Sequence, residues 1–279
     1  MSFIAFREDF NLDGSWPASS HDVLAYIAYQ SSQSRAPSTI CTYLAAISFV
    51  HKINGWLDPT NSFIVKKMKE GCKRQDIRSD SRRPITYIIL RQLVSILPSV
   101  CSSSFEAALF KAAFSLCFFG FLRVGEFASY SKSADTSRLI SFSDVSLSDN
   151  RLRVIIRFSK TDQVGVSTSL IFTRASDASV CPVIAIAEFL SVRGCFAGPL
   201  FTHFNREPLT RSQFAYIMRE GIRVLGLPTD GFTPHSFRIG AATSAALCGI
   251  PDAEIQALGR WKSSAFKRYI RPNLLDSRF

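Results

Sequence analysis

The chain has 279 residues, which is enough for about two domains of ordinary size. Hydrophobic residues make up 47% and charged residues 20% of it, and this composition excludes collagen-like, coiled-coil and disordered proteins. The formal net charge of +11 suits a polyanionic partner.

The sequence also argues against a membrane span, a secretory signal and a metal site. The longest apolar run, AAFSLCFFGFL from Ala112 to Leu122, falls short of the roughly 18 residues of a membrane span. The first residues do not read as a basic region followed by an apolar one, so we expect no secretory signal and an intracellular protein. The seven cysteines are scattered without metal-ligand spacing, so we expect neither a disulfide framework nor a metal, and no cofactor.

The positive charge is concentrated in the stretch 66–91. It holds nine basic and three acidic residues, and so contributes +6 of the net +11. Its apolar period ends after Met68 and Pro84 closes it, which predicts a helix end running into a solvated basic linker. We therefore expect a domain at 1–75, a linker at 76–84 and a second domain at 85–279. A charge run that is merely solvated is the alternative.

Three helices are predicted before this boundary. They begin at Ser19 or Ser20, at Ser38, and at Thr60 or Asn61, each at a residue that caps helices well. The residues Asn54 and Gly55 end the second helix. No strand pattern competes, so the N-terminal part is expected to be a small helical bundle.

The second part is predicted to be mainly helical with one small antiparallel sheet. Helices are expected at 86–97 and 104–119, followed by a short helical turn in RVGEFASY. The alternating, β-branched stretches 151–158 and 166–173 flank a turn-rich segment and predict a hairpin. Helical patterns then return in five segments: 181–194, 210–226, 233–247, 251–259 and 263–270.

Two charged residues, Arg123 and Glu126, lie within the apolar run FFGFLRVGEF. Charges in such a place are rarely left unpaired, and their spacing puts both on one helical face, so Glu126 can orient Arg123. A buried salt bridge with a purely structural role is the alternative.

The segment TPHSFRIGAAT predicts a helix start that can bind an anion. Thr233 would be its N-cap, and His235 and Arg238 would share a face in its first turn, where free N–H groups favour a phosphate. The small residues from Gly240 onward would let the helix pack closely. A structural histidine is the alternative for His235.

Three further residues are candidates. Lys160 lies in the hairpin turn, where a lysine is normally only solvated. Trp261 and Tyr269 lie near the C-terminus, and Tyr269 stands among Lys267, Arg268 and Arg271. Ordinary packing of two short helices would also explain the two aromatic residues.

The order and spacing of these residues resemble the tyrosine recombinase (phage integrase) family. That family carries, in order, an arginine, a hairpin lysine, His-x-x-Arg, a histidine or tryptophan, and a nucleophilic tyrosine. The matching residues are Arg123, Lys160, His235, Arg238, Trp261 and Tyr269. The phrases HSFRIGAAT and LGRWKSSAFKRYIRP resemble most the eukaryotic branch of DIRS-type retrotransposons and Cryptons. The resemblance covers residues 17–272.

The resemblance implies a two-domain DNA clamp that needs no metal. The helical domain and the basic linker would hold double-stranded DNA, and the chain would self-associate as a tetramer on paired sites, in the nucleus if the host is eukaryotic. The tyrosine would attack the scissile phosphate, the arginines and Trp261 would stabilise the transition state, Lys160 would be the general acid and His235 the proton acceptor. The residues expected to contact DNA are Lys73, Arg74, Arg78, Arg82, Arg83, Lys267 and Arg268.

Three features depart from the family pattern. Eight residues separate Trp261 from Tyr269, where bacterial and phage members usually have nine. A tryptophan keeps an N–H donor but cannot exchange a proton. The N-terminal domain usually has four helices, and only three are predicted here. Two alternatives therefore stay open: a catalytically silent, domesticated DNA-binding protein, and a nicking and religating activity like that of a type IB topoisomerase.

Overall fold

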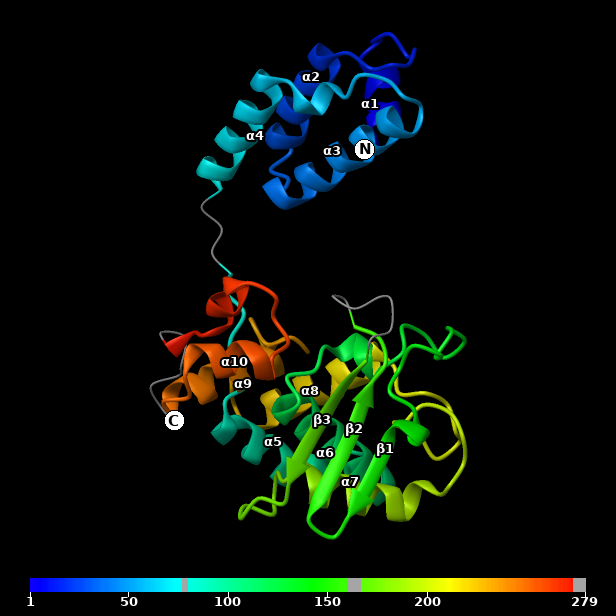
Figure 1. Ribbon diagram of the computed structural model, residues 1–279, viewed down its shortest axis with the longest axis vertical. Coiled ribbons are helices and arrows are strands. Elements are labelled where there is room, and N and C mark those ends of the chain that lie inside the picture. The colour runs from blue at the N-terminus through cyan, green and yellow to red at the C-terminus, as the bar shows by residue number, and fades with distance from the viewer. Residues whose placement is uncertain (77–79, 160–166, 273–279) are drawn as a thin grey trace. The chain divides into compact units, whose positions relative to one another are not determined.

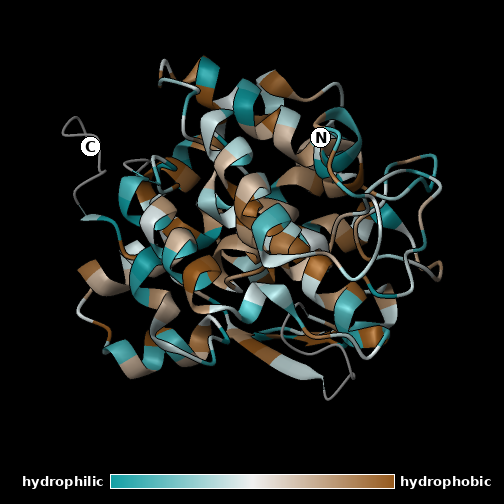
Figure 2. Cartoon of the chain, turned by 90° about the horizontal axis from the view of Figure 1, so that it is seen from above, coloured by the Kyte–Doolittle hydropathy of each residue, from teal (hydrophilic) through white to brown (hydrophobic). Residues whose placement is uncertain are grey.

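The computed structural model describes residues 1–76, 80–159 and 167–272, and within them the chain forms two compact units, Met1–Asp80 and Ser81–Phe279 (Figure 1). Each unit has its own hydrophobic core. Along most helices hydrophobic and hydrophilic residues alternate (Figure 2), as expected for helices that bury one face.

Among its described residues the first unit contains helices and connecting loops and no strand. Its elements are α1 (Phe3–Asp9), α2 (Ser20–Ser32), α3 (Pro37–Ile53), a 3-10 turn (Pro59–Asn61) and α4 (Phe63–Gln75). The hydroxyls of Ser19 and Ser62 cap α2 and α4, whereas α3 begins with Pro37 at its first position rather than with a Ser38 cap. The expectation of three helices is wrong, because α1 is a fourth.

The second unit combines seven-residue to sixteen-residue helices with a small sheet. Its elements in chain order are α5 (Tyr87–Val100), α6 (Ser104–Phe119), a 3-10 turn η2 (Val124–Glu126), a 3-10 turn η3 (Phe142–Asp144), β1 (Val145–Ser148), β2 (Arg151–Ile156), β3 (Thr168–Thr173), α7 (Pro182–Arg193), α8 (Arg211–Val224), α9 (Ser236–Leu247), α10 (Asp252–Leu258) and the 3-10 helix η4 (Ser264–Tyr269). The expected class, mainly helical with a small antiparallel sheet, is confirmed.

The sheet has the order β1-β2-β3, with both pairs antiparallel. Along β2, Leu152, Val154 and Ile156 are buried while Arg151 and Arg153 are exposed, so one face of the strand packs on the core. Helix α7 contacts β2 and β3. The expected hairpin is confirmed by the register of β2 and β3, and β1 is an additional edge strand.

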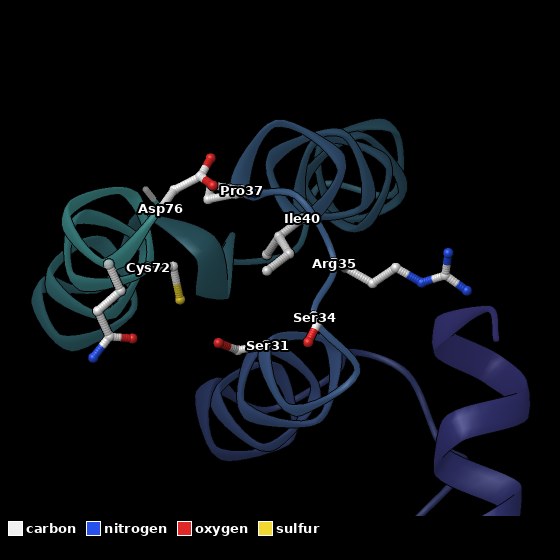
Figure 3. Close-up of a pocket in the computed structure, with 8 residues that line it drawn as sticks. Ser31, Ser34, Arg35, Pro37, Ile40, Cys72 and Asp76 are labelled. Carbon is white, nitrogen blue, oxygen red and sulfur yellow. The ribbon is translucent and has the colours of Figure 1, made fainter. Parts of the chain in front are cut away.

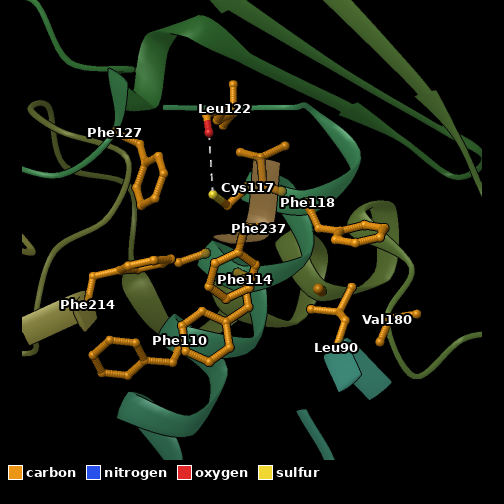
Figure 4. Close-up of a cluster of buried hydrophobic side chains, with 14 of the residues drawn as sticks. Leu90, Phe110, Phe114, Cys117, Phe118, Leu122, Phe127, Val180, Phe214 and Phe237 are labelled. Atoms are coloured by element: carbon orange, nitrogen blue, oxygen red, sulfur yellow. Dashed lines mark hydrogen bonds between the residues drawn. The ribbon is translucent and has the colours of Figure 1, made fainter. Parts of the chain in front are cut away.

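The core of the second unit is rich in phenylalanine. The rings of Phe114, Phe214 and Phe237 lie 4.9–5.3 Å apart, and they bring α6, α8 and α9 together (Figure 4). Such edge-to-face and tilted arrangements favour aromatic packing beyond the area buried. These contacts hold the first turn of α9 against the core.

Two close approaches fix the start of the second unit against α9. The backbone N–H groups of Arg83 and Ile85 donate to the carbonyls of Gly231 and Ser236. A Cβ at Gly240 would lie 1.6 Å from the carbonyl oxygen of Ile85, so only glycine fits there. The close packing expected at Gly240 is confirmed. Pro84 and Ile85 are buried, so this end of the expected linker is not a solvated segment.

Candidate active site

Arg123 and Glu126 form the first part of the site. The Arg123 guanidinium donates to Glu126 Oε1 at 3.2 Å, and its backbone N–H donates to Oε2 at 3.0 Å. The pairing expected from their spacing is present, but it is made across the 3-10 turn η2, with Arg123 as its N-cap, and not on an α-helical face. Glu126 is only 4% exposed, so it is a fixed counter-charge.

Arg238 lies in the first turn of α9 and is fully buried. Its guanidinium donates to the carbonyl oxygens of Phe121 and Gly259, and its central carbon lies 4.2 Å from the ring centre of Trp261. A cation over an indole face is attracted by the electrons of the ring. Arg238 therefore reaches the site from α9 in one defined position.

The start of α9 differs from the expectation. The helix begins at Ser236 with His235 as N-cap, and the Ser236 hydroxyl accepts the N–H of Thr233. Thr233 is thus not the cap, because a turn closed by its own carbonyl and the Ser236 N–H precedes the helix. His235 still stands next to the first turn, three residues before Arg238.

Tyr269 is brought to the same place by η4. Its half-buried ring lies 5.1 Å from the ring of His235 and 4.9 Å from that of Trp261, and Arg238 lies 5.7 Å from its centre. Three of the residues singled out in the sequence, His235, Arg238 and Trp261, thus meet around Tyr269. The eight-residue spacing from Trp261 does not keep Tyr269 out of the site.

Sequence reasoning missed Arg260. Its guanidinium donates to Glu126 Oε2 at 3.0 Å and to the carbonyl of Gly120 at 3.0 Å, and its side chain is 10% exposed. The signal was its distance from Tyr269, which is nine residues, the spacing usual for bacterial and phage members when counted from their histidine or tryptophan.

Two backbone positions in the left-handed region support this arrangement. Arg260 has φ 56° and Phe121 has φ 48°, values that residues other than glycine rarely adopt. The carbonyl of Phe121 accepts from both Arg238 and Arg260. Such backbone strain concentrates at functional sites, where the surrounding contacts maintain it.

The site carries a surplus of positive charge. Burial, then repulsion from Arg123 and Arg260, lowers the pKa of Arg238 to about 10, against the attraction of Glu126. Burial also lowers the pKa of Arg260. Both guanidinium groups keep their charge at neutral pH. Three arginines and one carboxylate leave a net charge of about +2, which suits a bound anion.

Three buried donors of the site have no hydrogen-bond partner among the described residues. They are the Nε of Arg238, the Nε of Arg260 and the Nε1 of Trp261. Buried N–H groups are nearly always paired, so an unpaired group calls for a ligand or water. Two of them belong to Arg238 and Trp261, which lie beside Tyr269, where an oxyanion would satisfy such donors.

The remaining predicted residues are less informative. Lys160 and Arg78 lie outside the described residues. Lys73 and Arg74 are exposed at the end of α4, Arg82 and Arg83 are half-buried at the start of the second unit, and Lys267 and Arg268 are exposed just before Tyr269. Within the part of the chain that the structure describes, no three histidine, cysteine or acidic residues are placed to hold a metal.

A pocket of about 320 Å³ lies elsewhere, in the first unit. It is bounded by the end of α2, the start of α3 and the end of α4, with Arg35, Cys72 and Asp76 among its lining (Figure 3). None of its lining residues is a predicted site residue. Among the described residues no helix is long and apolar enough to span a bilayer.

An integrase/recombinase XerD homologue from Selenomonas ruminantium is 25% identical over 264 residues, covering 91% of this chain and 74% of the relative. No family model matches.

Solved structures share the fold. A XerH site-specific recombinase bound to a palindromic difH substrate gives a TM-score of 0.64 at 14% identity, over 95% of this chain and 72% of that one. A lambda integrase dimer on a COC′ core site gives 0.59 at 17%, over 93% and 67%. The Tn1549 transposon integrase with circular intermediate DNA gives 0.56 at 14%, over 91% and 81%.

The chain therefore has the fold of the tyrosine recombinases. In sequence the chain is similar to the XerD homologue, and in fold it is similar to these recombinases and integrases.

Proposed function

We propose that this protein is a site-specific DNA recombinase or integrase that cleaves and rejoins DNA through a 3′-phosphotyrosyl intermediate. The observation that carries the proposal is the convergence of Tyr269 with His235, Trp261 and the buried Arg238. A tyrosine hydroxyl beside a histidine and a cluster of guanidinium groups is suited to attack a phosphodiester.

In the first step the Tyr269 Oη attacks the scissile phosphorus. The new P–O bond to tyrosine forms as the bond to the 5′ oxygen breaks, so the energy of the phosphodiester is kept for rejoining. His235 accepts the tyrosine proton, since its ring lies beside that of Tyr269. The free 5′ hydroxyl of the same or another strand then attacks the phosphotyrosine in the reverse sense.

The arginines meet the charge that develops on the non-bridging oxygens. Arg123 and Arg238 are the direct donors, and the surplus charge of about +2 compensates a phosphodiester as it gains negative charge in the transition state. Trp261 adds its indole N–H, which is buried and lacks a partner in the described chain. Because an indole cannot exchange a proton, its role is stabilisation and not acid–base catalysis.

Lys160 is assigned as the general acid for the departing 5′ oxygen. The assignment rests on the order of residues in the family, because Lys160 lies outside the described part of the chain. Residues 151–156 of β2 pair with residues 168–173 of β3, and Lys160 lies between these two strands in the sequence.

The partner is double-stranded DNA. The XerH, lambda integrase and Tn1549 integrase structures are DNA complexes, one of them a dimer, and their fold is the fold of this chain. We assign the phosphate contacts to Lys73, Arg74, Arg78, Arg82, Arg83, Lys267 and Arg268. Domains 1–75 and 85–279 would act as the two halves of a clamp. Self-association on paired sites, a nuclear location and the DIRS or Crypton branch belong to the same proposal.

A nicked suicide DNA substrate tests the proposal. With it, cleavage releases a short fragment and traps the covalent protein–DNA adduct. The Tyr269→Phe variant removes only the hydroxyl, so it should bind DNA and form no denaturation-resistant adduct. Tyr216→Phe is the matched control, because Tyr216 is 62% exposed on α8 and should leave the yield unchanged. An adduct at wild-type yield from Tyr269→Phe would refute the assignment.

A further inference from the structure

Thr243 makes two hydrogen bonds that the proposed chemistry does not use. It lies on α9, five residues after Arg238, and is fully buried. Its hydroxyl donates to the carbonyl of Tyr269 at 3.0 Å and accepts the N–H of Arg271 at 3.1 Å. One side chain thus holds the backbone on both sides of Ile270, directly after the nucleophile.

The tyrosine segment needs such an anchor. The 3-10 helix η4 has six residues, and helices of this kind are poorly bonded and rarely stable by themselves. Within it Phe266 is buried and packs 6.2 Å from Trp261. That contact fixes the start of the segment, and Thr243 fixes its end.

A second tie follows Tyr269. The Arg271 guanidinium donates to the carbonyl of Arg82 at 2.9 Å and to that of Arg268 at 3.0 Å. Arg82 lies three residues before Ile85, whose backbone N–H donates to the carbonyl of Ser236 at the start of α9. The tyrosine segment is therefore bound both to α9 itself and to the stretch that is hydrogen-bonded to α9.

The geometry links the nucleophile to the arginine that it must approach. Five residues on one α-helix correspond to a rise of about 7.5 Å, and Phe237 packs the first turn of this helix into the core. The Thr243 hydroxyl thus ties the backbone of Tyr269 to the helix that carries Arg238.

We propose that Thr243 is a positioning residue, whose hydroxyl clamps the Tyr269 backbone and holds the nucleophile in the active site of its own chain. The proposal rests on the proposed function for its catalytic consequence, and on the two hydrogen bonds alone for its structural one.

The experiment uses the whole chain and makes two comparisons. The first compares the wild type with Thr243→Val, and the second compares Thr243→Ser with Thr243→Ala. Within each pair the hydroxyl is the group that is lost, so the second pair serves if valine is not accommodated. Hydrogen exchange is followed in the peptide covering 264–272 and, as an internal control, in β2. Adduct formation is followed on the suicide substrate in a single turnover, with DNA affinity measured separately.

The clamp predicts faster exchange in 264–272 for Thr243→Val and Thr243→Ala, with β2 unchanged. It also predicts adduct formation slower by about tenfold or more at unchanged DNA affinity, and behaviour close to wild type for Thr243→Ser. Unchanged exchange, an unchanged rate despite faster exchange, or an equal defect in Thr243→Ser would each overturn it. If the wild type forms no adduct, the proposed function fails, while the exchange comparison still decides whether the clamp exists.

Discussion

Arg123 is the residue whose removal tests charge stabilisation most cleanly. Its side chain is 19% exposed and contacts Glu126, whereas Arg238 is bonded within the core and its loss would also disturb folding. We expect Arg123→Gln to cost about 2.7–4 kcal/mol of transition-state stabilisation, the scale of losing one oxyanion donor, with a much smaller loss of DNA affinity. Single-turnover adduct formation measures it. Equal losses in rate and affinity would show that Arg123 only binds.

Arg260 supports the site through Glu126 and the backbone before Arg123. A lysine keeps the charge but cannot span the carbonyl of Gly120 and the Glu126 carboxylate as a guanidinium does. Arg260→Lys should therefore lower the free energy of unfolding by about 1–3 kcal/mol, the cost of unpaired buried acceptors. Denaturant unfolding measures it.

The control for Arg260 is Arg223→Lys, in the exposed pair with Glu220. That arginine is 65% exposed, so its replacement should change stability by no more than about 0.5 kcal/mol. Similar effects of the two substitutions would mean that the bonds of Arg260 carry no special weight.

Among the elements, the basic stretch around residue 80 has its own prediction. Replacing Arg78, Arg82 and Arg83 with Gln should weaken binding about equally on all DNA sequences and reduce the slope of log affinity against log salt by about 0.9 for each lost phosphate contact. Gln leaves the Arg82 carbonyl, and so its bond from Arg271, in place. A salt titration of DNA binding measures the slope.

A control with the same charge change separates contact from net charge. Lys132, Arg206 and Arg223 are exposed, and two of them pair with acidic residues, so their replacement with Gln removes three charges away from the expected contacts. The slope should hardly change. If both triple variants reduce the salt slope equally, the basic stretch around residue 80 acts through the overall charge of the protein and does not contact the DNA phosphates.

The long elements could be predicted from the sequence because their apolar period is strong and their caps are explicit. Helices α5 and α6 begin after Thr86 and Ser103, and β2 alternates over six residues. Short elements could not. Helix α1 has seven residues and is held by tertiary packing of Phe3 and Phe6 on Tyr26, and β1 is an edge strand of four residues, too short for its alternation to be distinctive.

Those residues of the candidate site that match the order of residues in the family could be predicted from the sequence. Tyr269, Trp261, His235 and Arg238 meet in space, although their roles stay proposals. Arg260 was missed because its left-handed backbone and its bonds to Phe121 and Glu126 are tertiary features that no local pattern announces. The start of α9 was misplaced because a Thr-Pro pair predicts a cap, while the Ser236 hydroxyl binds the N–H of Thr233 instead.

For the whole molecule, the proposed chemistry leaves the phosphate charge to side chains. Cleavage of the suicide substrate should therefore persist in excess EDTA, because three arginines around Glu126 supply the positive charge that a metal would otherwise bring. Adduct yield with and without the chelator measures it. Activity that stops in EDTA and returns with magnesium would require a nuclease mechanism.

The nature of the whole reaction needs a second readout. A recombinase joins strands from two DNA sites, whereas an enzyme that only nicks and religates restores the original strand. We expect exchange between two differently labelled DNA sites. Adduct formation without exchange would favour a topoisomerase-like activity, and binding without an adduct would favour a silent DNA-binding protein.

The central claim is that Tyr269 becomes covalently joined to a 3′ phosphate of DNA. The most direct measurement is digestion of the trapped adduct from the suicide substrate, followed by mass spectrometry of the peptide that carries the nucleotide. The account predicts a phosphotyrosyl link at Tyr269, formed in EDTA and absent from Tyr269→Phe. A link at any other residue, or one through a 5′ phosphate, would contradict it.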